Sequence, residues 1–399
     1  MNKKKVAIIL IVFIAIFLTI MLVVNRDNVE ITNEVGNKSK KSNNFLTMNL
    51  EQTAGAGDYK TVTQSEWPTE GYKFNTELSR CENGSELSWD DVNKKILMSG
   101  VSADKCYVYF DIARFDKLCN TSTLACHVAK LYTGTQGENG IYYHNTSLTN
   151  GAGDNNYRYA GANPNNYICL GSDATTCPDD NLFRIIGVFG DKVKVIRDKS
   201  VVKMHWDTQD NTWSISSLNT YLNGTYLTSI GTLSDKIDMA TWKVGGNTWD
   251  NISVSTAKEV YDYEIKNPST TASTGETEYS AKIGLMYVSD YMFAVLQDNW
   301  TLVAYNSNDA TKDYRAVKTE NWLYLGSDEY TITRSSKYSG DVFAIYSSGE
   351  VYSYSVSCNS GDHLPCSAYA KYARPSFYLI SSVEYSGGTG TSSDPIRIK

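Results

Sequence analysis

The chain has 399 residues, a formal net charge of −7, and 29 tyrosines against only 7 prolines. An acidic chain gains no electrostatic attraction to phosphate backbones, which excludes nucleic-acid binding as its main role. The many tyrosines, together with asparagine, serine, threonine and glycine, are typical of a strand-rich and turn-rich surface domain, and the length is sufficient for two to three domains.

The first element is a run of nineteen apolar residues, 6–24, which directly follows three lysines at positions 3–5. As a helix it would be roughly 28 Å long, enough to cross the hydrocarbon core of a bilayer. The preceding lysines indicate a cytoplasmic N-terminus. We therefore expect residues 1–24 to be a cytoplasmic stub and single-pass transmembrane signal-anchor in the cell membrane, with the bulk of the chain extracellular. A signal peptide cleaved at an atypical site is the alternative.

The next stretch, residues 25–60, is polar and rich in serine and asparagine, which predicts a flexible stalk. Residues 61–135 follow with alternating apolar and polar positions, and they are expected to form a small disulfide-stapled β-module with a short helix. We expect Thr121 or Ser122 to cap this helix and Gly134 to end it.

The rest of the chain, residues 137–399, mixes strands with helices. Its clearest element is a β-hairpin, in which a Gly-Asp turn joins strands at 182–189 and 192–197. Serine caps and Asn-Gly or Asn-Pro ends predict helices at 216–222 and 255–265. Further strands are predicted at 342–346, 351–356 and 376–380. Helices inserted into a strand-rich unit predict an α+β domain.

Eight cysteines, an even number, are typical of an exported chain with disulfides. Short sequence separations favour local bridges and leave two cysteines for a fourth pair. The expected pairs are Cys81–Cys106, Cys119–Cys126, Cys169–Cys177 and Cys358–Cys366. Free thiols in a reducing setting are the alternative, and the lack of CxxC or HxxxH spacing argues against zinc.

We find no catalytic constellation in the sequence. The four histidines are scattered, and no GxSxG elbow, P-loop or dinucleotide fingerprint is present. No cofactor or metal is expected, and calcium is the one metal for which the sequence offers candidate ligands. Two loops, Asp154-Asn155-Asn156 and Asp179-Asp180-Asn181, offer the oxygen ligands that calcium prefers, although such residues are foremost turn formers.

Aromatic residues mixed with asparagine, serine and threonine gather in the C-terminal third. Aromatic faces with adaptable polar neighbours suit recognition of a glycan or a protein. The predicted ligand-binding residues are Trp300, Trp322, Tyr330, Arg334, Tyr338, Tyr352 and Tyr354. For any single tyrosine, burial in the core is at least as good an interpretation. Arg374 is expected to be buried and structural.

Several segments carry a resemblance to a known group of proteins. These segments are 157–167, 183–189, 281–291, 321–323, 331–334 and 373–379. Together they resemble membrane-anchored surface proteins of Gram-positive bacteria. The order of a Trp-Leu segment, a loop-rich hairpin and a closing Arg-Pro strand is similar to C-type-lectin-like folds, a group that includes formylglycine-generating-enzyme-like domains. The resemblance covers residues 137–399 and implies a C-type-lectin-like head.

The predicted function is that of a membrane-tethered extracellular recognition or adhesion protein. Its membrane contact would be residues 6–24, and its ligand, a glycan or a protein, would bind loops around Tyr330–Tyr354 and Cys358–Cys366. The resemblance also permits an enzyme as the alternative to this non-enzymatic role, because formylglycine-generating enzymes oxidise substrates with a cysteine pair, for which Cys358 and Cys366 are the candidates here. An extracellular hydrolase and a structural component of an envelope complex are also consistent with the sequence.

Overall fold

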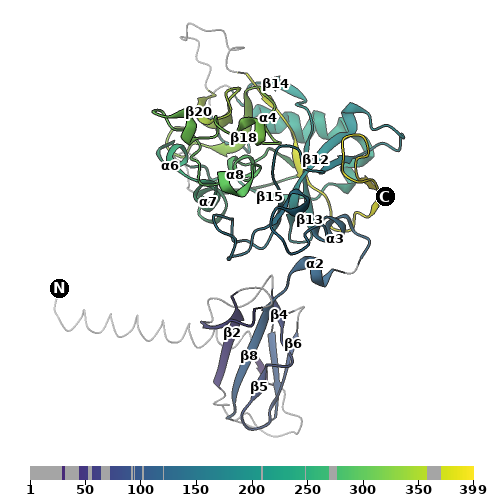
Figure 1. Ribbon diagram of the computed structural model, residues 1–399, viewed down its shortest axis with the longest axis vertical. Coiled ribbons are helices and arrows are strands. Elements are labelled where there is room, and N and C mark those ends of the chain that lie inside the picture. The colour runs from purple at the N-terminus through teal and green to yellow at the C-terminus, as the bar shows by residue number, and fades with distance from the viewer. Residues whose placement is uncertain are drawn as a thin grey trace, which may run out of the picture. The chain divides into compact units, whose positions relative to one another are not determined.

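The computed structural model describes residues 29–31, 45–52, 56–63, 72–90, 93, 95–100, 103–119, 121–207, 210–247, 249–268, 276–356 and 370–399 (Figure 1). The chain divides into two compact units, Met1–Arg114 and Phe115–Lys399. The apolar run at 6–24 lies outside the described residues. Among the helices that are described, none has the length and apolar character needed to cross a membrane.

The first unit is built from two β-sheets. The larger sheet has the order β3-β2-β8-β4, with β5 also paired to β8, and the smaller has the order β1-β7-β6. Its strands are β1 (Val29–Ile31), β2 (Phe45–Glu51), β3 (Tyr59–Val62), β4 (Tyr72–Phe74), β5 (Arg80–Cys81), β6 (Glu86–Asp90), β7 (Lys95–Ser99) and β8 (Lys105–Ile112). Strands β2 and β8 run parallel, paired from Phe45↔Lys105 to Leu50↔Phe110.

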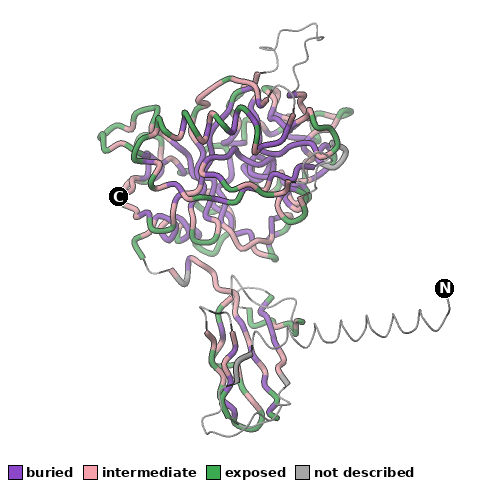
Figure 2. Tube along the Cα trace, turned by 180° about the vertical axis from the view of Figure 1, so that it is seen from behind, coloured by how far each residue is buried: buried purple, intermediate pink, exposed green. Residues whose placement is uncertain are grey.

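The two sheets of this unit enclose one apolar core. Alternate residues of β8 face inward, so that Cys106, Val108 and Phe110 are fully buried. Trp89 of the smaller sheet meets Phe110 edge to face, with 4.9 Å between ring centroids. Both sheets contribute residues to this core, and Figure 2 shows buried stretches within the unit.

Strands β2 and β3 lie largely within the range that composition predicts as a stalk. In β2, Met48 and Leu50 are buried against the core of the first unit. Because apolar residues alternate with polar ones in this short strand, and polar residues surround it, the average composition of the segment does not reveal the strand. The β-rich unit consequently begins before residue 61, and the short helix predicted for it belongs to the second unit.

The second unit is a mixed α+β structure dominated by strands. One sheet has the order β17-β22-β13-β12-β10-β9 with β11 paired to β12, another has the order β14-β21-β18-β19-β20, and two sheets are two-stranded, β15-β16 and β23-β24. The strands are β9 (Ile141–Tyr143), β10 (Tyr157–Tyr159), β11 (Tyr167–Cys169), β12 (Leu182–Phe189), β13 (Lys192–Arg197), β14 (Val202–Met204), β15 (Ala240–Lys243), β16 (Glu278–Ala281), β17 (Ile283–Gly284), β18 (Glu329–Arg334), β19 (Asp341–Ile345), β20 (Val351–Ser355), β21 (Lys371–Ala373), β22 (Ser376–Tyr378), β23 (Tyr385–Gly387) and β24 (Arg397–Ile398).

The helices of this unit are short. The α-helices are α2 (Phe115–Leu118), α3 (Leu124–Ala129), α4 (Ser217–Tyr221), α5 (Leu227–Ser229), α6 (Trp249–Val254), α7 (Ala257–Tyr261) and α8 (Val288–Phe293). Wide π turns are η4 (Leu222–Tyr226) and η6 (Asp262–Lys266), and 3-10 turns are η2 (Glu138–Gly140), η3 (Asp179–Asn181), η5 (Gly231–Lys236), η7 (Gln297–Asn299), η8 (Ala310–Lys312) and η9 (Lys318–Glu320).

The β12–β13 hairpin forms as the sequence predicts, and it lies in the middle of the larger sheet. Gly190 opens its turn with a φ of +62°, a conformation that favours glycine. A second glycine, Gly187, lies where the register shifts, and a Cβ there would be 2.0 Å from the carbonyl oxygen of Tyr157. A side chain at this position would therefore break the close approach of β10.

Three predicted helix boundaries are wrong: the end of the helix after Ser216 and both ends of helix α3. The helix after Ser216 continues past the predicted end at Asn223-Gly224, because the Asn223 amide donates to the carbonyl of Ile283 at 2.9 Å and holds the turn against β17. Helix α3 is capped by Thr123, whose hydroxyl accepts from the Cys126 amide at 3.4 Å. This helix ends at Ala129, before Gly134.

Candidate functional site

Three disulfides occur among the described residues, and they are the predicted pairs Cys81–Cys106, Cys119–Cys126 and Cys169–Cys177. The fourth predicted pair, Cys358–Cys366, lies outside the described residues. Disulfides persist in oxidising compartments, so the three bridges indicate an extracellular or secreted domain.

Four of the seven predicted ligand-binding residues lie in the interior of the second unit. Trp300, Trp322, Tyr330 and Arg334 are each no more than 3% exposed. The indole nitrogens of Trp300 and Trp322 donate to the carbonyls of Val295 and Tyr159. Side chains enclosed in this way present no surface to a ligand, so we correct their role to packing.

The other two buried residues, Tyr330 and Arg334, hold separate parts of the core together. The ring of Tyr330 packs against Trp206 with 5.7 Å between centroids. The guanidinium of Arg334 donates to the carbonyl of Glu276 at 2.6 Å and to the hydroxyl of Thr212 at 3.3 Å. Both lie on β18, which is covered on its two sides by β21 and β19.

The remaining three predicted residues, Tyr338, Tyr352 and Tyr354, reach the molecular surface. Tyr352 and Tyr354 lie on β20, the edge strand of its sheet, where they are two positions apart and share one face. Val351 of the same strand points the other way and is buried. Tyr338 is half exposed on the turn before β19, with the Lys337 ammonium 5.3 Å from its ring centroid.

Two more tyrosines, Tyr305 and Tyr346, complete a group on this face. The ring of Tyr352 makes edge-to-face contacts with Tyr305 and Tyr346, at 5.0 and 5.9 Å between centroids. Tyr346 also meets Tyr354 at 6.3 Å. We refer to these four residues, Tyr305, Tyr346, Tyr352 and Tyr354, as the tyrosine surface. The alternation in β20 marks two of them in the sequence, whereas Tyr305 is brought there by a distant loop.

Lys371 of strand β21, in the same sheet, supports the tyrosine surface. The Lys371 ammonium lies 3.8 Å from the ring centroid of Tyr354 and 5.0 Å from that of Tyr346. It also pairs with Asp328 at 2.5 Å. Burial alone would raise the pKa of Asp328, but hydrogen bonds from Lys371 and Ser347 hold that pKa below its usual value. The cation therefore fixes the orientation of two rings by cation–π contact.

The two loops proposed as calcium sites use their carboxylates for protein contacts. Asp154 accepts two hydrogen bonds from the Arg158 guanidinium at 2.9 and 2.5 Å. Burial alone would raise the pKa of Asp154, but the charge of Arg158 holds it well below the usual range. Asp179 and Asp180 pair with Lys199 and Arg197 at 2.5 and 2.6 Å.

One group of possible metal-ligand atoms occurs among the described residues: Cys81, Asp104 and Cys106. The two sulfurs in it are bonded to each other, so neither is a thiolate. Asp104 accepts hydrogen bonds from the backbone amides of Asn83 and Ser85 at 2.9 and 3.0 Å. This donor set holds a turn and does not fit a metal ion.

A cluster of buried charged residues lies at the start of helix α8. Lys194 of β13 pairs with Asp290 at 2.5 Å, and both side chains are almost fully buried. Glu264 accepts from the backbone amides of Val288 and Ser289, each at 3.0 Å. Burial raises the pKa of Glu264 to about 7 despite these hydrogen bonds. The cluster is closed to solvent, and we interpret it as the junction between helix α8 and the sheets.

Arg374 is buried, as its position before Pro375 predicts. Its guanidinium donates to both carboxylate oxygens of Glu329, at 2.8 and 3.1 Å, and to the carbonyl of Leu323 at 2.7 Å.

Comparison with known proteins adds no family to this description, because no family model, curated protein or solved structure matches the chain. The tyrosine surface is therefore the candidate site on its geometry alone.

Proposed function

We propose that the protein is a membrane-tethered extracellular recognition protein, which binds a glycan or protein ligand through the tyrosine surface of a lectin-like head. The apolar run at 6–24 would anchor it with the N-terminus in the cytoplasm, and the polar segment before Phe45 would give the head its reach. The observation that carries the proposal is the mutually supported group of four tyrosines around strand β20, in which Tyr352 is exposed and the other three are partly buried.

The chemistry of tyrosine suits this role. Each ring offers an apolar face for stacking and a hydroxyl for hydrogen bonding, and the side chain loses little conformational entropy when it is ordered. Contacts with Tyr305 and Tyr346 hold the ring of Tyr352, which is 37% exposed, before any ligand arrives. A preordered aromatic group on a sheet avoids part of the entropic cost of binding.

The nature of the ligand can be tested with the intact protein in detergent or nanodiscs. We expect binding on a glycan array or to whole cells, and we expect Tyr352→Ala to weaken it at least about tenfold, as for an aromatic residue central to an interface. Absence of binding in both formats would count against recognition as the function. Binding that Tyr352→Ala leaves unchanged would remove the tyrosine surface from it.

Tyr372 provides a matched control for this substitution. It lies on β21 of the same sheet and is 38% exposed, nearly the same as Tyr352. Its ring is approached by the Lys203 ammonium at 5.5 Å. Tyr372→Ala removes an equally exposed tyrosine outside the tyrosine surface and should leave binding unchanged. An equal loss in both variants would indicate damage to the sheet.

A further inference from the structure

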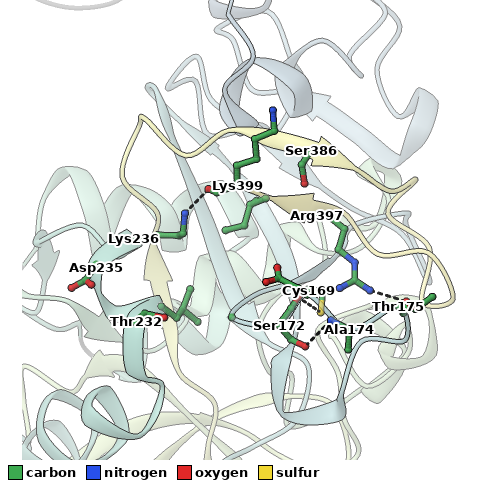
Figure 3. Close-up of a pocket in the computed structure, with 14 residues that line it drawn as sticks. Cys169, Ser172, Ala174, Thr175, Thr232, Asp235, Lys236, Ser386, Arg397 and Lys399 are labelled. Carbon is green, nitrogen blue, oxygen red and sulfur yellow. Dashed lines mark hydrogen bonds between the residues drawn. The ribbon is translucent and has the colours of Figure 1, made fainter.

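A cavity of about 760 Å³ in the second unit has charged groups of both signs in its lining (Figure 3). Lys236 donates to the C-terminal oxygen of Lys399, and the Arg397 guanidinium donates to two backbone carbonyls. Asp173 and Asp235 add negative charge to the same lining. The cavity therefore shows no preference for a ligand of either charge.

A smaller surface hollow of about 270 Å³ has a different lining. It is formed by residues 139–140 of η2 and by residues 160–165, the loop after β10. None of these residues carries an acidic or basic side chain. The backbone amides of Ala162, Asn163 and Asn165 find no acceptor among the described residues. Because backbone amides of a loop attract anions when they lack acceptors, this lining favours a negatively charged group.

Arg184 of strand β12 lies against the loop that forms the hollow. Only 6% of the residue is exposed, and its Nη2 donates to the carbonyl of Pro164 at 3.3 Å and to Oδ1 of Asn163 at 3.4 Å. Its Nη1 donates to the carbonyl of Trp322 at 3.5 Å. These contacts are long, because N–H···O bonds usually measure about 2.7–3.2 Å. Only Nε makes a short contact, at 2.8 Å to Oδ1 of Asn166, so both Nη groups keep donor capacity for a better acceptor.

The charge of Arg184 forms no ion pair with a carboxylate of the described residues. The ring centroids of Tyr167 and Trp322 lie 4.0 and 4.8 Å from its Cζ. Burial, together with the nearby Arg374 cation, lowers the pKa of Arg184 to about 10, so the guanidinium stays charged at pH 7. The charge of Asp198 opposes this shift without reaching ion-pair distance. Cation–π contacts offset part of the cost of burying the charge, and an anion would offset more of it.

Asn163 both lines the hollow and contacts Arg184, and its side chain is weakly held. Asn163 is exposed, and its Oδ1 accepts two long hydrogen bonds, from Nη2 of Arg184 and from the hydroxyl of Tyr167, both at 3.4 Å. We propose that the hollow binds one oxyanion group of a ligand, a carboxylate, sulfate or phosphate, which takes the place of the Asn163 amide beside the Arg184 guanidinium. A guanidinium recognises such groups through paired, charge-assisted hydrogen bonds.

Equilibrium dialysis of the intact protein against radiolabelled sulfate tests this proposal directly. We expect one bound sulfate per protein, with a dissociation constant below about 10 mM. Unlabelled phosphate and acetate should both displace the sulfate, and the stronger competitor identifies the group that the hollow prefers. Sodium chloride at the same ionic strength should compete at least about tenfold less well. No bound sulfate up to about 10 mM, or equal competition by chloride, would overturn the proposal.

The variant Asn163→Asp tests the charge of Arg184 with almost no change in the shape of the loop. Its carboxylate would lie beside Nη2 of Arg184 and occupy the position of the anion. We expect sulfate affinity to fall at least about tenfold, while the urea midpoint of the second unit rises because Arg184 gains a charged partner. This rise should vanish below about pH 4, where the aspartate is protonated. A lower urea midpoint at pH 7, or an unchanged sulfate affinity, would overturn the proposal.

Three further variants place the sulfate site. Arg184→Gln removes the cation and should abolish sulfate binding; if it fails to fold, the urea midpoint of Asn163→Asp still tests the role of Arg184. Asn308→Asp is the matched control, since it adds the same charge at an exposed asparagine outside the hollow, and it should leave sulfate affinity unchanged. Tyr352→Ala should also leave it unchanged, because Tyr352 belongs to the tyrosine surface. A loss of sulfate binding in either control would refute the hollow as the site.

Discussion

Replacing Glu264 with glutamine should change the pH dependence of stability of the second unit. Glu264 is 3% exposed, and burial raises its pKa from 4.5 to about 7. A carboxyl group with a raised pKa in the folded state is bound to its proton more tightly there than in the unfolded chain. The contribution of Glu264 to the unfolding free energy is therefore complete below about pH 4.5, and it is lost as the pH rises towards 7.

The magnitude follows from the size of the shift. Moving a pKa from 4.5 to about 7 corresponds to roughly 3 kcal/mol of unfolding free energy, since one unit equals about 1.4 kcal/mol. The glutamine variant carries no titrating group at 264. It also pays a cost that is independent of pH, because its amide nitrogen faces one of the backbone amides of Val288 and Ser289.

The assay is urea unfolding of both proteins between pH 4.5 and 8, followed by tryptophan fluorescence. Trp206, Trp213, Trp242 and Trp300 are fully buried in the second unit and report its unfolding. The difference in unfolding free energy between the variant and the wild type should shift in favour of the variant by up to about 3 kcal/mol as the pH rises. A difference that stays constant with pH, or one that shifts in favour of the wild type, would refute the inference that Glu264 holds a proton in the folded state.

Three further substitutions have expected outcomes. Asp154→Asn should destabilise the second unit by about 3–5 kcal/mol at pH 7, because it leaves the Arg158 charge buried without its partner. This loss of stability should shrink below about pH 4, and unfolding measured as a function of pH checks it. Removing the Cys81–Cys106 bridge with paired alanines should cost the first unit about 2–4 kcal/mol in thermal unfolding, and no change in melting would contradict a structural role. Trp300→Ala should cost about 3–5 kcal/mol in urea unfolding, whereas a loss under 1 kcal/mol would contradict its place in the core.

Local features of the fold could be predicted from the sequence. The β12–β13 hairpin and the three disulfides depend on neighbours within a few tens of residues, and their turn residues and spacings are visible in the chain. Strand β2 could not be recognised in the same way. Its few apolar residues gain their burial from β8, which follows more than fifty residues later.

The candidate site was predictable only in part, because exposure depends on the position of a strand in its sheet. Tyr330 and Tyr352 both lie on strands and both pair with Ala344, on either side of it. Tyr330 belongs to an interior strand and packs against Trp206, whereas Tyr352 belongs to the edge. Nothing in the local sequence distinguishes these two tyrosines.

The parallel pairing of β2 and β8 determines how the first unit responds to a pulling force. A pull between the chain before Phe45 and the chain after Ile112 drags the two adjacent strands past each other, so that all the backbone hydrogen bonds from Phe45↔Lys105 to Leu50↔Phe110 are loaded together. Such shear is resisted far better than the successive opening of single bonds. If these strands do separate, the Cys81–Cys106 bridge still keeps residues 82–105 from extending. The first unit is thus built to resist a force applied along these two strands.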